Sequence, residues 1–492
     1  MKSKKTILIA SVAALVLAFT ACQNQPKTDQ KAAESKTDIK QVQTKDEIKD
    51  NAKEEKDIQD KKENEVVKSD NPKASEFAEK VFEKVKNHWP HMNKIWPTYD
   101  YTKHNLILFH LDENGEPTDA WKINVKGINK LQASEYDKID YPQVDGYSNL
   151  DYQGSKSIAM SFDEESLKDV DKSANTLHVT ASHELVHFYY QGKLEVGGTR
   201  TQPYPVEKTP RQYRYMVMKN LEDAYKNPKN KEKALAQAKY WYEKWKTEFP
   251  NEYNDIRSTD IAEGTAKYTE YLSEIVNDKT GKEDVKKAVL KLINIDREFL
   301  SADSESYEMG AFSALLLDEQ NPNWKNNFYE SNTTLEELLL KDVKAVEEKM
   351  NPEIEKKINE NIESFNVDVK KNLENITKVY EDKNIPYLKI DKSESTASFS
   401  SEGVFKYKDH EVASKYSAAF GVKDKTIKIN KLSSIEEFDD TNEYVIIPLT
   451  MEHSVKNGVL TVKSNELEVN GVEVKTEKDS EGRTIYSVKV DK

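Results

Sequence analysis

The hydrophobic pattern of the chain changes its period twice between residue 74 and the C-terminus. Residues 74–85 repeat apolar side chains at helical spacing, and three runs typical of β-strands follow them: 104–112, 119–131 and 156–163. From residue 173 to about residue 380 the period is mostly that of amphipathic helices. Strands and helices are therefore expected to occupy separate stretches of the chain.

Strand-like alternation returns over residues 385–492. Asn457-Gly458 and Asn470-Gly471 separate alternating runs there, and Asn-Gly is a strong signal for a tight hairpin turn. The whole pattern predicts an α+β protein with three successive parts. These are a domain with a small N-terminal sheet and a mostly helical remainder (74–325), a helical segment (326–384), and a β-rich C-terminal domain (385–492).

The first 21 residues have the composition of an export signal. Residues 2–5, KSKK, are mostly basic and precede an apolar stretch over 6–19, and two small residues then precede Cys22, the only cysteine. This order resembles the lipobox of bacterial lipoproteins, although Phe19 stands where leucine is usual. The resemblance implies a lipid on Cys22 and anchoring at the extracytoplasmic face of a bacterial cell membrane. An ordinary signal peptide with an incidental Cys22 is the alternative.

Charge separates the next segment from the folded body. Residues 22–73 are rich in Lys, Asp, Glu, Gln and Asn and contain no aromatic residue, so they cannot bury enough apolar surface to fold. We interpret them as a disordered tether. The full chain has a net charge of −14, which is the opposite of the balance that phosphate binding requires. We therefore expect no nucleic-acid partner.

The chemistry of the chain is concentrated in the motif H-E-x-x-H at His183, Glu184 and His187. Residues four apart on a helix project from the same side, so the two histidines can share one metal ion. Glu184 flanks them, close enough to contact a water on that ion but too constrained to be a ligand itself. This is the zincin arrangement, and it predicts a catalytic zinc site with Glu184 as the general base. A buried helix with merely hydrogen-bonded histidines is the alternative.

A catalytic zinc ion takes three protein ligands, so a third ligand is expected in addition to the histidines. Glu207 lies among prolines on an irregular segment, and Glu222 lies on a predicted helix with no small residue beside it. Glu263 is preferred over both, because Gly264 and Ala266 would let its helix pack closely against the metal helix.

Together these residues resemble a known family. The H-E-x-x-H helix, followed by E-G-x-A-x-Y over 263–268, resembles the gluzincin zinc metallopeptidases, especially the aminopeptidase N and leukotriene A4 hydrolase type. Residues 307–312, YEMGAF, resemble the family's Y-x-K-G-A segment, with Met309 in place of the lysine. That match implies that Tyr307 hydrogen-bonds the tetrahedral intermediate. Residues 183–198 also have a partial likeness to the motif helix of bacterial collagenases.

The chain also departs from this family. The aminopeptidase segment G-x-M-E-N, which recognises a free substrate N-terminus, is absent upstream of the motif. The interval between His187 and Glu263 is much longer than in those families, and an inserted helical segment over 212–249 would fill it. Residues 325–492 match no family pattern.

The resemblance implies a membrane-anchored extracellular peptidase that hydrolyses peptide bonds with a metal-activated water. One zinc ion would be bound by His183, His187 and Glu263, with Glu184 and Tyr307 as the catalytic residues.

A peptide or protein substrate is expected, and the strand over 156–163 is the candidate for pairing with it by strand addition. A zinc hydrolase of a non-peptide amide or ester, and an inactive peptidase-like binding lipoprotein, are the alternatives. Substrate identity, endo- or exopeptidase action, the role of the C-terminal domain and oligomeric state stay open at this stage.

Overall fold

The computed structural model describes residues 71–491, with the exception of 114, 137, 140, 143, 145, 193, 195, 197–200, 278–280, 297–301, 396–398 and 440. The predicted signal peptide, Cys22 and nearly all of the predicted tether lie outside the described residues. Within the part of the chain that is described, no helix is both long and apolar enough to cross a membrane. The observed architecture is α+β, as the sequence predicts, with an N-terminal sheet, a helical middle and a β-rich C-terminal region.

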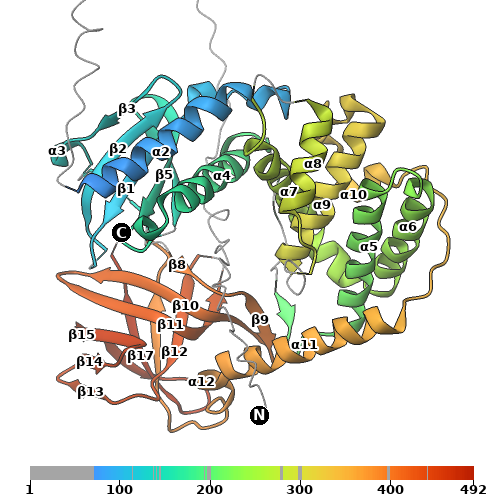
Figure 1. Cartoon of the computed structure of the whole chain (residues 1–492). Coiled ribbons are helices and arrows are strands. Elements are labelled where there is room, and N and C mark those ends of the chain that lie inside the picture. The colour runs from blue at the N-terminus through green and yellow to red at the C-terminus, as the bar shows by residue number, and fades with distance from the viewer. Residues whose placement is uncertain are drawn as a thin grey trace, which may run out of the picture.

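A five-stranded mixed sheet forms the N-terminal part of the molecule (Figure 1). Its strands are β1 (Asn105–Leu111), β2 (Pro117–Asn124), β3 (Gly127–Lys130), β4 (Tyr147–Tyr152) and β5 (Ser155–Phe162). Their order is β3-β2-β1-β5-β4, in which β1 and β5 run parallel and all other neighbours antiparallel. β5, which contains most of the predicted run over 156–163, is therefore an interior strand, and β4 is an edge.

Two helices, α2 (Pro72–His88) and α4 (Val170–Tyr189), cover one face of this sheet (Figure 1). Apolar residues at helical spacing on α2 face the strands, and the ring of Phe77 stacks on Phe162 of β5 with centroids 4.2 Å apart. Asp169 begins α4 by accepting the backbone N–H of Lys172. The short α3 (Ala133–Tyr136) packs on the opposite face through Tyr136. The sheet thus fixes the position of α4, the helix that carries H-E-x-x-H.

The middle of the chain is helical and packs against α4 from the other side. Its helices are α5 (Lys208–Lys226), α6 (Lys231–Glu248), α7 (Pro250–Ser273), α8 (Lys282–Leu292), α9 (Ala302–Gln320), α10 (Leu335–Leu339), α11 (Pro352–Asn372) and α12 (Glu374–Thr377). Short 3-10 helices are η1 (Trp89–Lys94), η2 (Tyr101–Lys103), η3 (Ser166–Lys168), η4 (Pro322–Lys325) and η5 (Tyr329–Ser331). The α5–α6 pair fills the long interval between the motif and Glu263.

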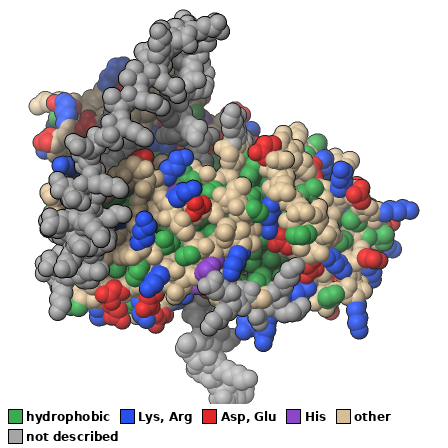
Figure 2. Space-filling view, turned by 90° about the horizontal axis from the view of Figure 1, so that it is seen from above, with side chains coloured by type: hydrophobic (Ala, Val, Ile, Leu, Met, Phe, Trp, Pro, Cys, Tyr) green, Lys and Arg blue, Asp and Glu red, His purple; other side chains and the backbone are tan. Residues whose placement is uncertain are grey.

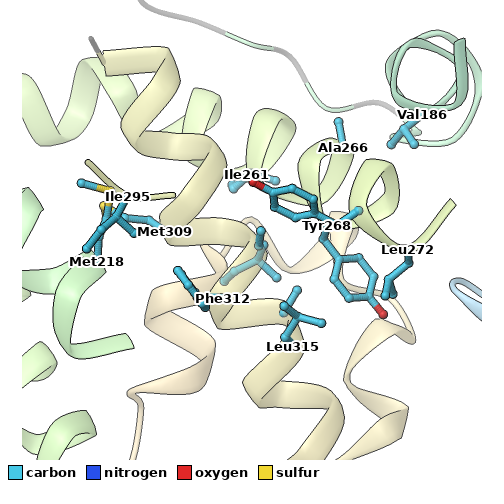
Figure 3. Close-up of a cluster of buried hydrophobic side chains, with 14 of the residues drawn as sticks. Val186, Met218, Ile261, Ala266, Tyr268, Leu272, Ile295, Met309, Phe312 and Leu315 are labelled. Atoms are coloured by element: carbon cyan, nitrogen blue, oxygen red, sulfur yellow. The ribbon is translucent and has the colours of Figure 1, made fainter. Parts of the chain in front are cut away.

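Helices α7 and α9 touch through their backbones. A Cβ atom built on Gly310 would lie 2.2 Å from the Cα of Gly264, so neither position has room for a side chain. The sequence predicts that Gly264 packs against the metal helix, but its neighbour is α9. Ala266 is the small residue on the side of α4, where Figure 3 shows it beside Val186. Apolar side chains of both helices, including Tyr268 and Phe312, complete this part of the core (Figure 3).

The C-terminal region is a large, mostly antiparallel sheet (Figure 1). Its strands are β7 (Tyr387–Asp391), β8 (Phe399–Ser400), β9 (Val404–Tyr407), β10 (His410–Val422), β11 (Lys425–Phe438), β12 (Glu443–Pro448), β13 (His453–Lys456), β14 (Val459–Lys463), β15 (Leu467–Glu473), β16 (Lys475–Lys478) and β17 (Thr484–Lys489). The Asn457-Gly458 pair forms the predicted tight turn, between β13 and β14, with both residues at positive φ. The Asn470-Gly471 pair does not: it lies within β15.

One strand from the helical middle joins this sheet. β6 (Gln202–Pro203) follows the metal helix in sequence and pairs in parallel with β9, where Gln202 lies opposite Phe405. The helical middle and the C-terminal sheet are therefore joined by backbone pairing between β6 and β9 as well as by α11. On the face that Figure 2 draws, acidic and basic side chains of the described residues are interspersed rather than gathered by sign.

Candidate metal centre

Helix α4 brings the two motif histidines together. Their side chains are each only 3% exposed, and their Nε2 atoms lie 3.1 Å apart. The helical period explains the pairing, because residues four apart lie one above the other on the same face. Apolar neighbours on α4, among them Leu185 and Val186, are fully buried and hold this turn of the helix against the core.

Helix α7 supplies a carboxylate to the same point. Glu263 is 1% exposed, and its Oε2 lies 3.1 Å from His187 Nε2 and 3.4 Å from His183 Nε2. Ligand bonds of about 2.0–2.1 Å to a tetrahedral zinc ion place neighbouring donors about 3.3 Å apart, so these separations fit one shared ion. His183, His187 and Glu263 thus form a group that could hold a metal ion.

Each imidazole is oriented by a second partner at its Nδ1 atom. His183 Nδ1 lies 3.0 Å from Glu270 Oε2, and His187 Nδ1 lies 3.1 Å from Gln191 Oε1. Such partners hold the proton on Nδ1 and leave Nε2 as the donor to a metal. Gln191 in turn donates through Nε2 to the carbonyl of Ala262, at 2.7 Å, so α4 and α7 are joined beside the site.

Glu270 and Gln191 were not identified from the sequence. Glu270 lies seven residues after Glu263 on the same face of α7, whereas Gln191 lies four residues after His187, just beyond the end of α4. That spacing is a usable signal once the ligands are known. Acidic and amide residues are so frequent in this chain that such a spacing alone does not identify Glu270 and Gln191.

The carboxylates dominate the electrostatics of the group in the absence of a metal. Burial lowers the pKa of His183, but Glu263 and Glu270 outweigh it and raise that pKa to about 10. For Glu270, burial raises the pKa, whereas Lys267 and His183 lower it further, to about 2. Lys267 donates from Nζ to Glu270 Oε1 at 2.8 Å. The buried carboxylates therefore favour positive charge at the centre of this group.

Glu184 lies beside the donors without joining them. Its side chain is 2% exposed, and Oε1 lies 4.0 Å from His183 Nε2. Burial raises the pKa of Glu184 to about 7, against the opposing effect of the two histidines. Tyr147, on the edge strand β4, hydrogen-bonds this carboxyl. From the sequence we assigned no role to Tyr147, because nothing in a lone strand tyrosine marks it as a neighbour of the motif.

Tyr307 is also brought to the site, from α9. Its ring meets the ring of His183 edge-on with centroids 5.9 Å apart, and the Lys267 ammonium lies 5.5 Å from its ring centroid. The two rival glutamates are not part of the metal group. Glu207 is exposed and directly precedes α5, and Glu222 forms an ion pair with Lys226 on the same helix.

The arrangement offers three converging donors, a buried carboxyl within reach of a water on a bound ion, and a phenol whose ring stands against one of the imidazoles. Chemically, this can polarise a carbonyl group, activate a water molecule and move one proton. No protein-family model, curated protein or solved structure matches the chain.

Proposed function

We propose that the protein is a membrane-anchored, extracellular zinc peptidase that hydrolyses peptide bonds with a metal-activated water. The observation that carries the proposal is the convergence of His183, His187 and Glu263 beside the buried carboxyl of Glu184. Three donors with an adjacent base are the parts that a hydrolytic zinc site requires. The anchor and the extracellular location are supported by residues 1–22 of the sequence.

Zinc is the ion that this donor set favours. Two imidazole nitrogens and one carboxylate oxygen suit zinc, whereas calcium and magnesium prefer sites made of oxygen alone. Three protein ligands leave one coordination position for water or substrate. A bound zinc ion would supply Lewis acidity, which polarises a carbonyl group and lowers the pKa of water.

Glu184 is the group proposed to move the proton. It would accept a proton from the attacking water and return it to the amine nitrogen of the leaving group. A buried carboxyl beside the donor group is placed for both steps, because a general base must lie within hydrogen-bond reach of the proton that it moves. The hydrogen bond from Tyr147 would hold the carboxyl in one orientation.

Tyr307 is proposed to stabilise the oxyanion. Its ring stands edge-on to the His183 imidazole, which brings this side chain next to the donor group. A phenol that donates a hydrogen bond to developing negative charge commonly contributes a few kcal/mol to transition-state stabilisation.

The substrate is proposed to pair with β4 rather than with the strand expected from the sequence. β5 is hydrogen-bonded on both sides, to β1 and to β4, and has no free edge to offer. β4 is the outer strand, and its first residue, Tyr147, touches the base. An extended peptide added to β4 would therefore pass beside Glu184.

The proposal is tested by comparing metal content with peptide cleavage in matched variants of residues 74–492. Glu184→Gln should retain one zinc ion and lose at least about 100-fold in kcat, because it keeps the shape of the base and removes its function. His187→Ala and Glu263→Ala should lose both zinc and activity. Glu222→Gln is the control and should change neither, because Glu222 pairs with Lys226 on α5 and is not part of the metal group.

A peptide library provides the substrate for this comparison. Zinc retained in full by both ligand variants would overturn the proposed metal centre. Zinc binding without cleavage of any peptide, but with hydrolysis of simple esters or amides, would replace the peptidase by a different zinc hydrolase.

The anchor has a separate test. Cys22→Ala should abolish lipid labelling and release the protein from the membrane fraction or leave its signal peptide uncut. Unchanged fractionation and labelling in this variant would contradict the lipoprotein proposal.

A further inference from the structure

A cluster of buried charged side chains joins α7, which carries Glu263, to α9, which carries Tyr307. Arg214 of α5, Asp260 of α7 and Glu305 of α9 are all fully buried. Arg214 donates from Nη2 to Asp260 Oδ1 at 2.8 Å and from Nη1 to Oδ2 at 3.2 Å, which is a two-pronged contact. Its Nε donates to Glu305 Oε2 at 2.8 Å.

The same guanidinium reaches the residue next to Tyr307. Arg214 Nη2 donates to Ser306 Oγ at 3.2 Å, and Ser306 Oγ donates to Asp260 Oδ1 at 2.6 Å. The flat face of the guanidinium lies over Trp245 of α6, 4.5 Å from its ring centroid. The hydrogen bonds of Arg214 thus join Asp260 of α7 to Glu305 and Ser306 of α9.

Net stability does not explain such a cluster. A buried ion pair gains little over apolar side chains of the same size, because removing charges from water costs about as much as their attraction returns. What a fixed, two-pronged contact adds is a single relative position of the groups that it joins. Two functional groups of the site depend on the relative position of α7 and α9.

Those groups are the third ligand and the phenol. Asp260 precedes Glu263 by one helical turn on α7, and Ser306 directly precedes Tyr307 on α9. Between the two helices the backbones meet at Gly264 and Gly310, where no side chain can absorb a shift. A displacement of α9 along α7 would therefore move Tyr307 relative to Glu263.

We propose that Arg214 is a positioning residue that sets Glu263 and Tyr307 in register with each other and with the motif histidines. The inference rests on the proposed function for its catalytic consequence. Its structural part, the placement of Glu263 as a ligand, concerns metal binding alone and can be measured without any substrate.

Arg214→Lys is the main test, because lysine keeps the charge but cannot make the two-pronged contact. The full-length protein is loaded with Zn²⁺ for chelator competition and with Co²⁺ for visible absorption. We expect an affinity for Zn²⁺ at least about 10-fold lower and an altered Co²⁺ spectrum, with far-ultraviolet circular dichroism unchanged. On a cleavable peptide we expect kcat to fall at least about 10-fold with KM within about twofold.

Two further variants keep the test decisive if Arg214→Lys folds poorly. Ser306→Ala removes only the hydroxyl that bonds Asp260 of α7. It should lower Zn²⁺ affinity and kcat in the same direction as Arg214→Lys, but by a smaller factor. Arg257→Lys is the matched control, since this α7 arginine bonds Asn332 and Glu337 away from α9. It should leave metal affinity, spectrum and kcat unchanged.

The outcomes separate the two proposals. If Arg214→Lys and Ser306→Ala lower only the melting temperature and leave Zn²⁺ affinity, Co²⁺ spectrum and kcat as in the parent protein, the positioning role is wrong. If the parent protein binds Zn²⁺ in a manner that depends on Glu263 but cleaves no peptide, the proposed function is wrong. The effect of Arg214→Lys on metal affinity still decides the inference in that case.

Discussion

At the scale of single residues, the partners of the imidazole Nδ1 atoms decide how well the donors converge. Glu270 fixes His183 and Gln191 fixes His187. Glu270→Gln and Gln191→Ala should each weaken Zn²⁺ binding by about 10–100-fold, the usual effect of removing such a partner. Competition with a chromophoric chelator measures it.

Glu274→Gln provides the control for Glu270→Gln. Glu274 lies at the end of the same helix, and its Oε1 accepts a hydrogen bond from Asn175 at 2.7 Å, away from the ligands. Its replacement should leave metal affinity unchanged. Equal affinities for the Glu270→Gln variant and the parent protein would contradict the orienting role of Glu270.

The group that could hold a metal ion could be predicted from the sequence, but the residues that orient it could not. His183, Glu184 and His187 are specified by local spacing on one helix, which a sequence shows directly. Glu263 required a hypothesis about which distant helix packs against α4. The structure confirms that the helix of Glu263, α7, does so. Tyr147 comes from a strand about 40 residues before the motif, and only the folded sheet brings it to Glu184.

At the scale of elements, the contact between α7 and α9 is the tightest constraint near the site. Gly310→Ala would place a methyl group 2.2 Å from Gly264 Cα, so the helices must separate. We expect a loss of about 1–3 kcal/mol in the free energy of unfolding, as for other overpacked cores, despite the better helix propensity of alanine. Urea denaturation measures this loss.

Gly421→Ala is the control for this change. Gly421 lies in β10, and no atom lies within 4 Å of the place that its Cβ would take, so a methyl group meets no neighbour there. Its replacement should shift stability by no more than about 0.5 kcal/mol. A Gly310→Ala protein as stable as the parent would show that α9 can move away from α7 at no cost.

Element boundaries and neighbours were only partly predictable. The sequence pattern correctly indicated strands over 104–112 and 156–163 and helices after residue 173. It could not show that β5 inserts between β1 and β4, because parallel pairing joins segments that are far apart in sequence. For the same reason the small residues Gly264 and Ala266 indicated close packing but not that they face two different helices.

At the scale of the whole molecule, a buried carboxyl links stability to pH. Glu336 of α10 is fully buried, and its Oε2 has no hydrogen-bond partner among the described residues. Burial, and next the nearby Asp260, raise the pKa of Glu336 above its ordinary value of 4.5. The folded state therefore holds this proton more tightly than the unfolded state, and stability falls as the pH rises above the ordinary carboxyl range.

Glu336→Gln should remove that alkaline penalty. At pH 9 the variant should melt higher than the parent by about 1–2 °C, as expected for a chain of this size if ionising the buried group costs about 1–2 kcal/mol. At pH 5, where Glu336 is protonated when folded, the two proteins should melt within about 0.5 °C of each other. Calorimetry at both pH values measures the difference, and an equal difference at pH 5 and pH 9 would contradict the raised pKa.

The pairing of β6 with β9 has a consequence for the order in which the chain can complete itself. Gln202 follows the metal helix closely, yet its partner Phe405 lies about 200 residues further along. During synthesis, β6 cannot pair its backbone until the C-terminal sheet has been made. Contacts of such long sequence separation form late in folding. A chain that is cut short before β9 would therefore contain His183, His187 and Glu263 but leave β6 without its strand partner.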